Sequence, residues 1–446
     1  MYNVLPNVTE NTKIMLLGFS REGQSSYRYI RKLYPDLTIY IHDIREIDTS
    51  TLTNVVTVCG EKYLEHLEQY DMILKSPGIV LTPQQVASCR VLTSQTELFI
   101  QAFGNRVIGI TGTKGKSTTS SLTYHVLNKI DPNTFLVGNI GIPCFDCIEQ
   151  LNEESLVVFE LSCHQLEFIH CSPHVGIILN FFEEHLDHYG TYENYKNAKK
   201  HIYEYQTKED HLLCNENILA EISPLSHVTT VGESTTADVC VNTRTITVPS
   251  THTTFTVEEQ DTHLLGLHNI YNIAMVYAIV SLYHTVSAED FLRYISDFEP
   301  LAHRLKYIGT YSDIYFYDDS ISTACETTIS ALQSIPNVDT VLVGGMDRGI
   351  DYTELEDYLL HVYTHNVILM PDSGYRVYEE LLSKVDESAL QRFHKVKDLE
   401  EAVSLSKKIT AKDHACVLSP AAASYGFFKD FAHRGDCFIG FVKNTE

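Results

Sequence analysis

The segment Gly112-Thr113-Lys114-Gly115-Lys116-Ser117-Thr118 has residue types and a spacing that suit phosphate chemistry. It lies between an apolar run and a helical pattern, so its backbone N–H groups can converge on phosphate oxygens at a helix N-terminus. Lys116 can reach the β- and γ-phosphates, and Ser117 or Thr118 can reach a magnesium ion. The strict P-loop pattern would have glycine where this chain has Ile110. A nucleotide site is nevertheless favoured over a turn without a ligand.

An acid and an imidazole follow two further apolar runs. Glu160 comes directly after Leu156–Phe159, and His185 comes shortly after Gly176–Leu179. Open α/β sheets bind ligands at the carboxyl ends of their strands, which makes Glu160 a candidate magnesium ligand. A solvated acid at a strand end is the alternative. His185 and Lys199, which is on a predicted helix, are expected to face the same cavity.

The elements that must position these residues alternate between strands and helices. The first ones are predicted as strand Ile14–Leu17, helix Gln24–Leu33 and strand Thr38–His42, which is the opening of a parallel sheet. The same rhythm occurs twice more, so we expect an α/β protein with three domains, at residues 1–98, 99–300 and 301–446. Further strands are predicted at Val107–Ile110, Leu156–Phe159, Gly176–Leu179, Ile314–Tyr317, Thr340–Val343, Asn366–Leu369 and Ala415–Leu418, further helices at Tyr192–Tyr205 and Asn269–Ser281, and a strand-and-loop excursion at Thr229–Thr256.

A second glycine-containing turn, Gly18–Gly23, follows the first predicted strand. It matches a dinucleotide-binding fingerprint only if Ser20 replaces the middle glycine, and Asp43 lies at the distance where an acid would meet a ribose. An ordinary tight turn without a ligand stays open as the alternative.

Composition excludes several classes of protein. A chain of 446 residues with 44% hydrophobic content needs more than one core. A net charge of −25 argues against a nucleic-acid partner, which would require clustered cations. The polar start Met1–Lys13 and the short apolar runs predict a cytoplasmic protein with reduced cysteines and no membrane partner. Cys144 and Cys147 have the spacing of a zinc or redox pair, but a second such pair is missing, so coincidence is favoured.

Taken together, the motifs resemble the Mur ligase family in their order and approximate spacing. The resemblance covers the chain and implies an α/β ligase with a Rossmann-like UDP-binding domain, a central P-loop ATPase domain with a parallel-rich sheet, and a C-terminal Rossmann-like domain that binds an amino acid. The motifs that carry it are Gly112–Thr118, Glu160-Leu161-Ser162, Glu184–Asp187, Ala198-Lys199, His268–Asn272, His303-Arg304, Asp319-Ser320 and Leu418–Ala421.

Within that family, the chain is most similar to members that add glutamate to UDP-N-acetylmuramoyl-L-alanine in peptidoglycan precursor synthesis. This likeness rests on Ser76–Ile79, Gly138–Gly141 and Ser419–Ser424. It implies that ATP phosphorylates the substrate carboxylate and that the amino group of D-glutamate attacks the acyl-phosphate. Open alternatives are an L-glutamate-adding variant, a folylpolyglutamate-type ligase, an oxidoreductase built on the first glycine turn, and a non-catalytic nucleotide sensor. A monomer is expected.

The resemblance also implies roles for individual residues. Lys116, Glu160, His185 and Lys199 would be catalytic, and Ser117 would bind magnesium together with the last three. Lys199 would first be carbamylated by CO₂, because a carbamate oxygen can ligate magnesium whereas an ammonium cannot; an unmodified surface lysine is the alternative. The expected ATP-binding residues are Gly112, Thr113, Lys114, Gly115, Lys116, Ser117, Thr118, Asn269, Asn272, Arg304 and Asp319; the expected UDP-substrate residues are Arg21, Glu22, Ser76, Pro77, Gly78 and Asn139; and the expected glutamate-binding residues are Thr323, Arg348, Ser424, Tyr425 and Phe431.

The chain departs from the family pattern at two places. Ile321 occupies the position of a lysine that helps to hold the glutamate side chain in D-glutamate enzymes. Either another cation such as Arg348 binds that carboxylate, which a guanidinium can do bidentately, or the amino acid takes a different orientation. Cys163-His164 replaces the usual Ser-Phe pair. The first departure leaves the choice between D- and L-glutamate open.

Overall fold

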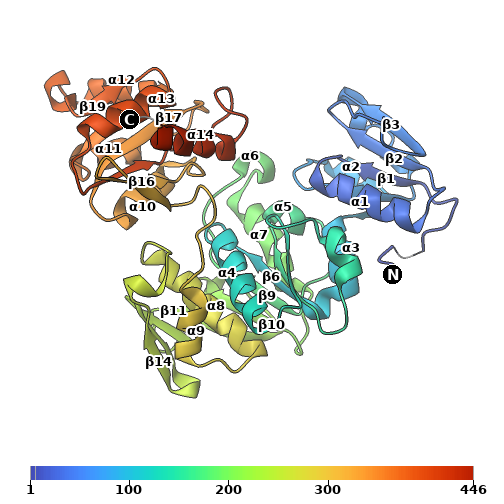
Figure 1. Ribbon diagram of the computed structural model, residues 1–446. Coiled ribbons are helices and arrows are strands. Elements are labelled where there is room, and N and C mark those ends of the chain that lie inside the picture. Colours follow the sequence, from blue (N-terminus) through green and yellow to red (C-terminus); the bar gives the residue numbers. More distant parts are fainter. Residues whose placement is uncertain (1, 6, 445–446) are drawn as a thin grey trace. The chain divides into compact units, whose positions relative to one another are not determined.

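Three separate β-sheets organise the protein (Figure 1), as seen in a computed structural model that describes residues 2–5 and 7–444. The sheets contain five, nine and six strands, which confirms the predicted α/β class. Contacts divide the chain into two compact units. Unit 1 comprises the residues up to Asp261 together with Ile270–Ser296, and unit 2 comprises Thr262–Asn269 and the residues from Asp297 onward. The domain boundaries at residues 98 and 300 stay a prediction.

The first sheet is parallel throughout and has the strand order β3-β2-β1-β4-β5. This is the order of a Rossmann-like half-sheet with its switch point beside β1. All four residues of β1 are buried, as expected for a central parallel strand that is covered on both faces. The elements are β1 (Ile14–Leu17), α1 (Arg21–Leu33), β2 (Ile39–Asp43), β3 (Val55–Cys59), β4 (Met72–Lys75), α2 (Pro83–Ser88), β5 (Leu92–Thr93) and α3 (Gln95–Phe103).

The second sheet has the order β14-β13-β12-β11-β10-β9-β6-β8-β7. Its pairs are parallel from β7 to β12, whereas β13 and β14 add an antiparallel edge that accounts for the predicted threonine-rich excursion. The strands are β6 (Val107–Thr111), β7 (Thr134–Gly138), β8 (Leu156–Glu160), β9 (Val175–Ile178), β10 (His211–Asn215), β11 (His227–Gly232), β12 (Val239–Asn242), β13 (Thr245–Val248) and β14 (Thr253–Thr256). The helices are α4 (Lys116–Ile130), α5 (Cys163–Leu166), α6 (Leu186–Tyr189), α7 (Tyr192–Glu204), α8 (His268–Tyr283) and α9 (Ala288–Ile295).

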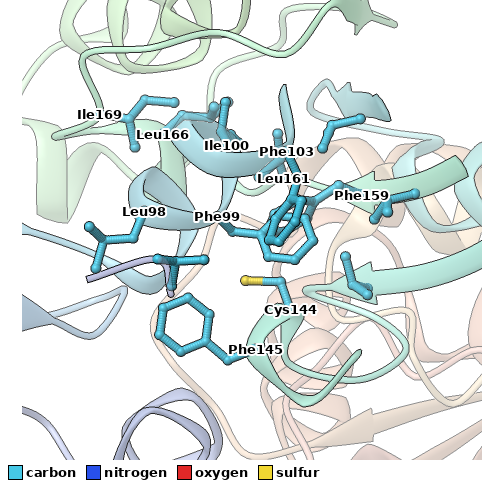
Figure 2. Packing of buried hydrophobic residues seen from close by; sticks show 14 of the residues in the cluster. Leu98, Phe99, Ile100, Phe103, Cys144, Phe145, Phe159, Leu161, Leu166 and Ile169 are labelled. Atoms are coloured by element: carbon cyan, nitrogen blue, oxygen red, sulfur yellow. The ribbon is translucent and has the colours of Figure 1, made fainter. Parts of the chain in front are cut away.

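A cluster of large apolar side chains packs beside β8 (Figure 2). Phe99 and Phe103 of α3 lie with ring centroids 5.0 Å apart, and Phe99 meets Phe159 edge-on. Cys144 points into this cluster, where burial raises the pKa of its thiol well above the ordinary value. The Cys147 thiol donates to the Cys144 carbonyl oxygen at 3.2 Å. Both cysteines therefore serve as packing residues of the core.

The third sheet has the order β15-β16-β20-β17-β18-β19, and only its edge strand β15 is antiparallel. The strands are β15 (Lys306–Tyr311), β16 (Ile314–Asp318), β17 (Val338–Gly345), β18 (Asn366–Asp372), β19 (Phe393–Lys395) and β20 (Ala415–Leu418). The helices are α10 (Cys325–Ser334), α11 (Thr353–His361), α12 (Ser373–Lys384), α13 (Leu399–Ile409) and α14 (Phe431–Asn444).

Most predicted elements are present, with boundaries shifted by a few residues. β1 and β20 match the prediction residue for residue, whereas β8 extends one residue further and ends on Glu160. The first helix begins three residues earlier than predicted, so that Arg21 and Glu22 lie in its first turn. Among the described helices, none combines the length and apolar character that crossing a bilayer requires.

Candidate active site

The phosphate loop connects β6 to α4, as the sequence predicts. Gly115 immediately precedes α4 with a φ of +84°, a conformation that glycine adopts without strain. A Cβ atom on Gly112 would lie 2.9 Å from Cβ of Leu179, so the close approach of the two backbones also requires glycine there. The Lys116 ammonium donates to the carbonyl oxygens of Gly112 and Thr113 at 2.9 and 2.8 Å. Ser117 and Thr118 follow in the first turn of α4.

Two residues that the sequence did not single out hold this loop in place. Backbone N–H groups of Thr113 and Lys114 donate to Oδ1 of Asn180 at 3.0 and 2.8 Å. The hydroxyls of Thr113 and Tyr195 lie 2.9 Å apart. Asn180 comes just after β9, so its position after a buried strand was the signal that could have identified it. Nothing comparable marked Tyr195, because the fold alone brings α7 beside the loop.

Lys199 lies against the same loop. Its side chain is buried, and its Nζ donates to the Gly112 carbonyl oxygen at 2.8 Å and lies 4.7 Å from the centre of the Tyr195 ring. Burial, followed by the neighbouring Lys116 ammonium, lowers the pKa of Lys199 to about 7. The alternative of a surface lysine is therefore wrong, and a substantial fraction of the buried amine is neutral near pH 7.

Glu160 is fully buried at the end of β8. Its Oε1 accepts a hydrogen bond from Nδ2 of Asn139 at 2.7 Å, while Oε2 has no hydrogen-bond partner within the described part of the chain. The alternative of a solvated acid is wrong. A buried carboxylate oxygen that accepts no hydrogen bond is costly unless a cation or a proton compensates its charge. Oε2 of Glu160 therefore suits a magnesium ion as a ligand. Asn139, predicted to contact the UDP substrate, lies against Glu160.

His185 immediately precedes α6 with a φ of +57°, which is uncommon outside glycine. About half of its side chain is exposed, and its Nε2 lies 3.9 Å from Oε2 of Glu184. The other oxygen of Glu184 pairs with Nζ of Lys114 at 3.1 Å. The ring centres of His185 and Tyr195 are 6.1 Å apart, so His185 and Lys199 share Tyr195 as a neighbour.

The first glycine turn and the segment after β4 bring the predicted UDP-substrate residues other than Asn139 to the carboxyl ends of β1 and β4. The Ser76 hydroxyl donates to the Gly18 carbonyl oxygen at 3.1 Å, and Pro77 and Gly78 follow it. Arg21 donates to the Gly141 carbonyl oxygen at 2.6 Å. Nε2 of Gln165 donates to Glu22 at 2.8 Å, and burial raises the pKa of Glu22 to about 6.

Asp43 and Lys75 also lie at this end of the first sheet, and the structure gives each a place that the sequence did not predict. Asp43 accepts from the backbone N–H of Phe19 at 2.7 Å and pairs with Arg45, so the acid of the imperfect dinucleotide fingerprint supports the turn itself. Lys75 was not predicted. It is buried beside Ser76, and burial lowers its pKa to about 8.

The remaining predicted ATP residues belong to different units. Asn272 lies in unit 1, where its Oδ1 accepts from the Thr119 hydroxyl at 3.2 Å, one turn into the helix that follows the phosphate loop. Asn269 lies in unit 2, and its Nδ2 donates to the Leu265 carbonyl oxygen at 2.6 Å.

Asp319 and Arg304 also lie in unit 2. Asp319 is buried and accepts from the hydroxyls of Ser322 and Ser419 at 2.5 and 2.8 Å. Burial raises the pKa of Asp319 to about 6, although these hydrogen bonds and the nearby charge of Arg304 oppose the increase.

The predicted glutamate-binding residues lie on segments that follow β16, β17 and β20 in unit 2. Arg348 donates to the Thr323 carbonyl oxygen at 3.3 Å, Ser424 is buried, and Tyr425 and Phe431 are exposed. A buried arginine that the sequence did not reveal, Arg434, ties two of these segments together. Its guanidinium donates to the carbonyl oxygens of Ser320 and Ala422 at 2.7 and 3.0 Å.

A glycine-rich loop between a parallel strand and a helix, with a buried carboxylate at the end of the neighbouring strand, defines a nucleotide-dependent α/β enzyme. The family model of the Mur ligase middle domain matches residues 110–280. A relative from Clostridioides difficile, UDP-N-acetylmuramoylalanine--D-glutamate ligase, is 30% identical over 97% of this chain and 99% of its own length. A relative of the same name from Ligilactobacillus salivarius is 28% identical over 97% of this chain and 96% of its own length.

The chain therefore belongs to the Mur ligase family and is an ATP-dependent ligase. Solved structures share its fold. MurF ligase from Thermotoga maritima in complex with ADP has a TM-score of 0.61, 15% identity, and coverage of 97% of this chain and 95% of that one. MurC from the same organism also has a TM-score of 0.61, with 18% identity and coverage of 98% of this chain and 100% of that one.

Proposed function

We propose that this ligase adds D-glutamate to UDP-N-acetylmuramoyl-L-alanine in peptidoglycan precursor synthesis. The names of its full-length relatives support the substrate pair. The observation that carries the chemistry is the convergence of Lys116 and the buried Lys199 on the Gly112 carbonyl oxygen, with the buried Glu160 on the neighbouring strand β8. This places two amines and an acid around one phosphate loop.

In the proposed reaction, an oxygen of the substrate carboxylate attacks the γ-phosphorus of ATP and ADP leaves. The amino nitrogen of glutamate then attacks the acyl carbon of the acyl-phosphate, loses a proton, and displaces phosphate to form the amide. Phosphoryl transfer depends mainly on positioning and on neutralising charge. Lys116, which now donates to two loop carbonyls, would turn to the phosphate oxygens, while the N–H groups of the loop orient them.

Magnesium would neutralise phosphate charge at this site. Glu160 would bind it through Oε2, and His185 and Ser117 are the further proposed ligands from this chain. Lys199 would contribute as a carbamate, because its neutral amine can attack CO₂ and release a proton, which leaves an anionic oxygen donor. The lowered pKa of Lys199 supports this step, since a fully protonated ammonium has no lone pair for it.

Substrate recognition is proposed at two separate places. The residues that would bind the UDP-sugar are Arg21, Glu22, Ser76–Gly78 and Asn139, the last of which lies next to Glu160. In unit 2, Arg348 would bind the glutamate side-chain carboxylate in place of the lysine that Ile321 replaces, since a guanidinium binds a carboxylate bidentately. Ser424 and the exposed aromatic rings of Tyr425 and Phe431 would complete that site together with Thr323.

The direct test is the release of phosphate by the purified protein. We expect release to require UDP-N-acetylmuramoyl-L-alanine, D-glutamate, ATP and Mg²⁺ together, and omission of any one of them should reduce it to background. Chromatography of the product should show the UDP-sugar extended by one glutamate.

Two parallel reactions discriminate the alternatives. Replacing D-glutamate with L-glutamate should abolish the product, and formation of product with only the L-isomer would reverse the assignment of the isomer. Replacing the UDP-sugar with a folate and L-glutamate should release no phosphate. Activity in that reaction alone would overturn the proposed function in favour of a folylpolyglutamate-type ligase.

A further inference from the structure

A cluster of metal-ligating side chains lies outside the proposed magnesium ligands. His164 is in the short helix α5, Glu167 follows that helix, and His188 is in α6. Nε2 of His188 lies 3.0 Å from a carboxylate oxygen of Glu167, and the ring centres of His164 and His188 are 4.4 Å apart. One ligand atom from each of the three residues lies within 4.8 Å of the other two. We call His164, Glu167 and His188 the zinc triad.

The surroundings of the zinc triad favour a bound ion over three solvated side chains. The side chain of His188 is 8% exposed and that of Glu167 is 21% exposed, so solvent reaches them from a limited direction. The Tyr189 hydroxyl lies 3.2 Å from Nδ1 of His164, and its ring stacks on the His164 ring at an interplanar angle of 8°. A hydrogen bond to one imidazole nitrogen fixes the ring and leaves the other nitrogen to a metal, as is usual for metal-bound histidines.

We propose that His164, Glu167 and His188 bind one divalent cation of the zinc class, with water as the fourth ligand. Two imidazole nitrogens and one carboxylate oxygen are a donor set that zinc uses in open four-coordinate sites. Magnesium prefers an all-oxygen shell, so the zinc triad and the Glu160 site select different ions. Tetrahedral bonds of about 2.1 Å bring ligand atoms to roughly 3.4 Å from one another, so modest side-chain rotations close the triad around the ion.

The bound ion would connect two segments that carry proposed catalytic residues. α5 begins three residues after Glu160, and α6 begins immediately after His185. The zinc triad joins the first of these segments to the second. Zinc is therefore expected to stiffen the segment around His185 without replacing magnesium.

A competing arrangement uses the neighbouring side chains. Cys163, His164 and His185 also offer ligand atoms within 4.8 Å of one another. Zinc in that arrangement would include a thiolate and would remove His185 from the proposed magnesium site. The two arrangements share His164 but differ in every other ligand, so substitutions can separate them.

The test measures metal binding by the full-length protein without ATP or substrates, so its outcome is independent of the proposed ligase activity. The native protein should bind one Zn²⁺ per chain in the presence of excess Mg²⁺, and zinc should raise its melting temperature. His188→Asn and Glu167→Gln should each weaken zinc binding by more than about tenfold, since even residues that only support the ligands change affinity by that factor. His185→Asn and Cys163→Ser should bind zinc as the native protein does.

A matched control and a measurement without variants complete the test. His263 pairs with Glu299 at 3.1 Å, a separation similar to that of His188 and Glu167, so His263→Asn should leave zinc binding unchanged. Co²⁺ bound to the native protein should show the visible absorption of a four-coordinate site without a thiolate charge-transfer band. A thiolate band, a loss of zinc with His185→Asn but not with His188→Asn, or the absence of stoichiometric binding would each overturn the proposal.

Discussion

Lys199 shows how burial changes what a single residue can do. In solution, a lysine amine is protonated at neutral pH and cannot attack CO₂. Here the helix α7 carries the side chain into the interior beside Lys116, and both burial and that neighbouring charge lower its pKa to about 7. Carbamylation, as proposed, would put an anionic oxygen next to the phosphate loop, where it would be available to a magnesium ion.

The activity of Lys199→Ala tests this role. We expect phosphate release to fall by about 10²–10³-fold, the usual consequence of removing one group that stabilises charge in a transition state. Short carboxylic acids such as acetate should restore part of the activity, because their oxygens can occupy the space of the carbamate.

Lys200→Ala is the matched control for that experiment. Lys200 is the next residue of α7 and pairs with Glu193 at 3.3 Å. Its substitution should leave activity within about twofold and should show no response to acetate, since an ion pair with the largely exposed Glu193 contributes little. Equal losses in the two variants, or no recovery of Lys199→Ala, would contradict carbamylation.

At the scale of elements, the connection between β6 and α4 depends on backbone geometry as much as on side chains. Gly115 has a φ of +84°, and a Cβ atom there would lie 2.8 Å from Oδ1 of Asn272. Asn272 belongs to α8 and also accepts from the Thr119 hydroxyl of α4. The start of α4 and α8 therefore pack so closely at Gly115 that a larger residue there would displace the Asn272 side chain.

Gly115→Ala is expected to reduce both stability and ATP binding. A left-handed alanine costs roughly 1–2 kcal/mol, and displacement of Asn272 should raise the KM for ATP by at least about tenfold. Gly60→Ala provides the comparison, because Gly60 has a φ of +78° but a Cβ atom there would meet no neighbour within 4 Å.

Gly60→Ala should lower the stability of the protein through backbone strain but should leave the KM for ATP unchanged. Urea denaturation and steady-state kinetics of both variants measure the two quantities. If Gly115→Ala keeps the native KM for ATP while losing the same stability as Gly60→Ala, the contact between the loop and Asn272 is unimportant for nucleotide binding.

At the scale of the whole molecule, the proposed ATP residues are divided between the two compact units. Lys116 and Asn272 belong to unit 1, whereas Asn269, Arg304 and Asp319 belong to unit 2. Each unit has a core of its own, and chains of this kind commonly depart from two-state unfolding. Nucleotide bound at the phosphate loop should therefore stabilise unit 1, which contains that loop.

We expect urea to unfold the protein in two transitions, and Mg²⁺ with ATP should shift the transition of unit 1 to higher urea concentrations. At a ligand concentration of 100 times Kd, the shift corresponds to about 2.7 kcal/mol. Lys116→Met should abolish this shift, whereas substitution of the exposed Lys62 by Met should preserve it. The absence of this shift in the native protein would contradict nucleotide binding at the phosphate loop.

Much of the fold follows from local patterns in the sequence. β1 and β20 could be predicted residue for residue because short apolar runs bounded by turn residues mark buried parallel strands. The position of the loop Gly112–Thr118 between a strand and a helix could be predicted from its glycines and from the apolar run before it. The place of Glu160 at the end of β8 could be predicted because it directly follows a short apolar run.

Only the tertiary structure decided which side chains meet and how deeply they are buried. Asn180, Tyr195 and Arg434 act through contacts with residues 67, 82 and 114 positions away in the chain. His164 and His188 are a further example. Their helices α5 and α6 follow different strands, and the tertiary fold brings the two rings together. The lowered pKa of Lys199, and the lack of a donor to Oε2 of Glu160 among the described residues, both depend on the exclusion of solvent. Solvent is excluded when distant segments pack together, which no local pattern encodes.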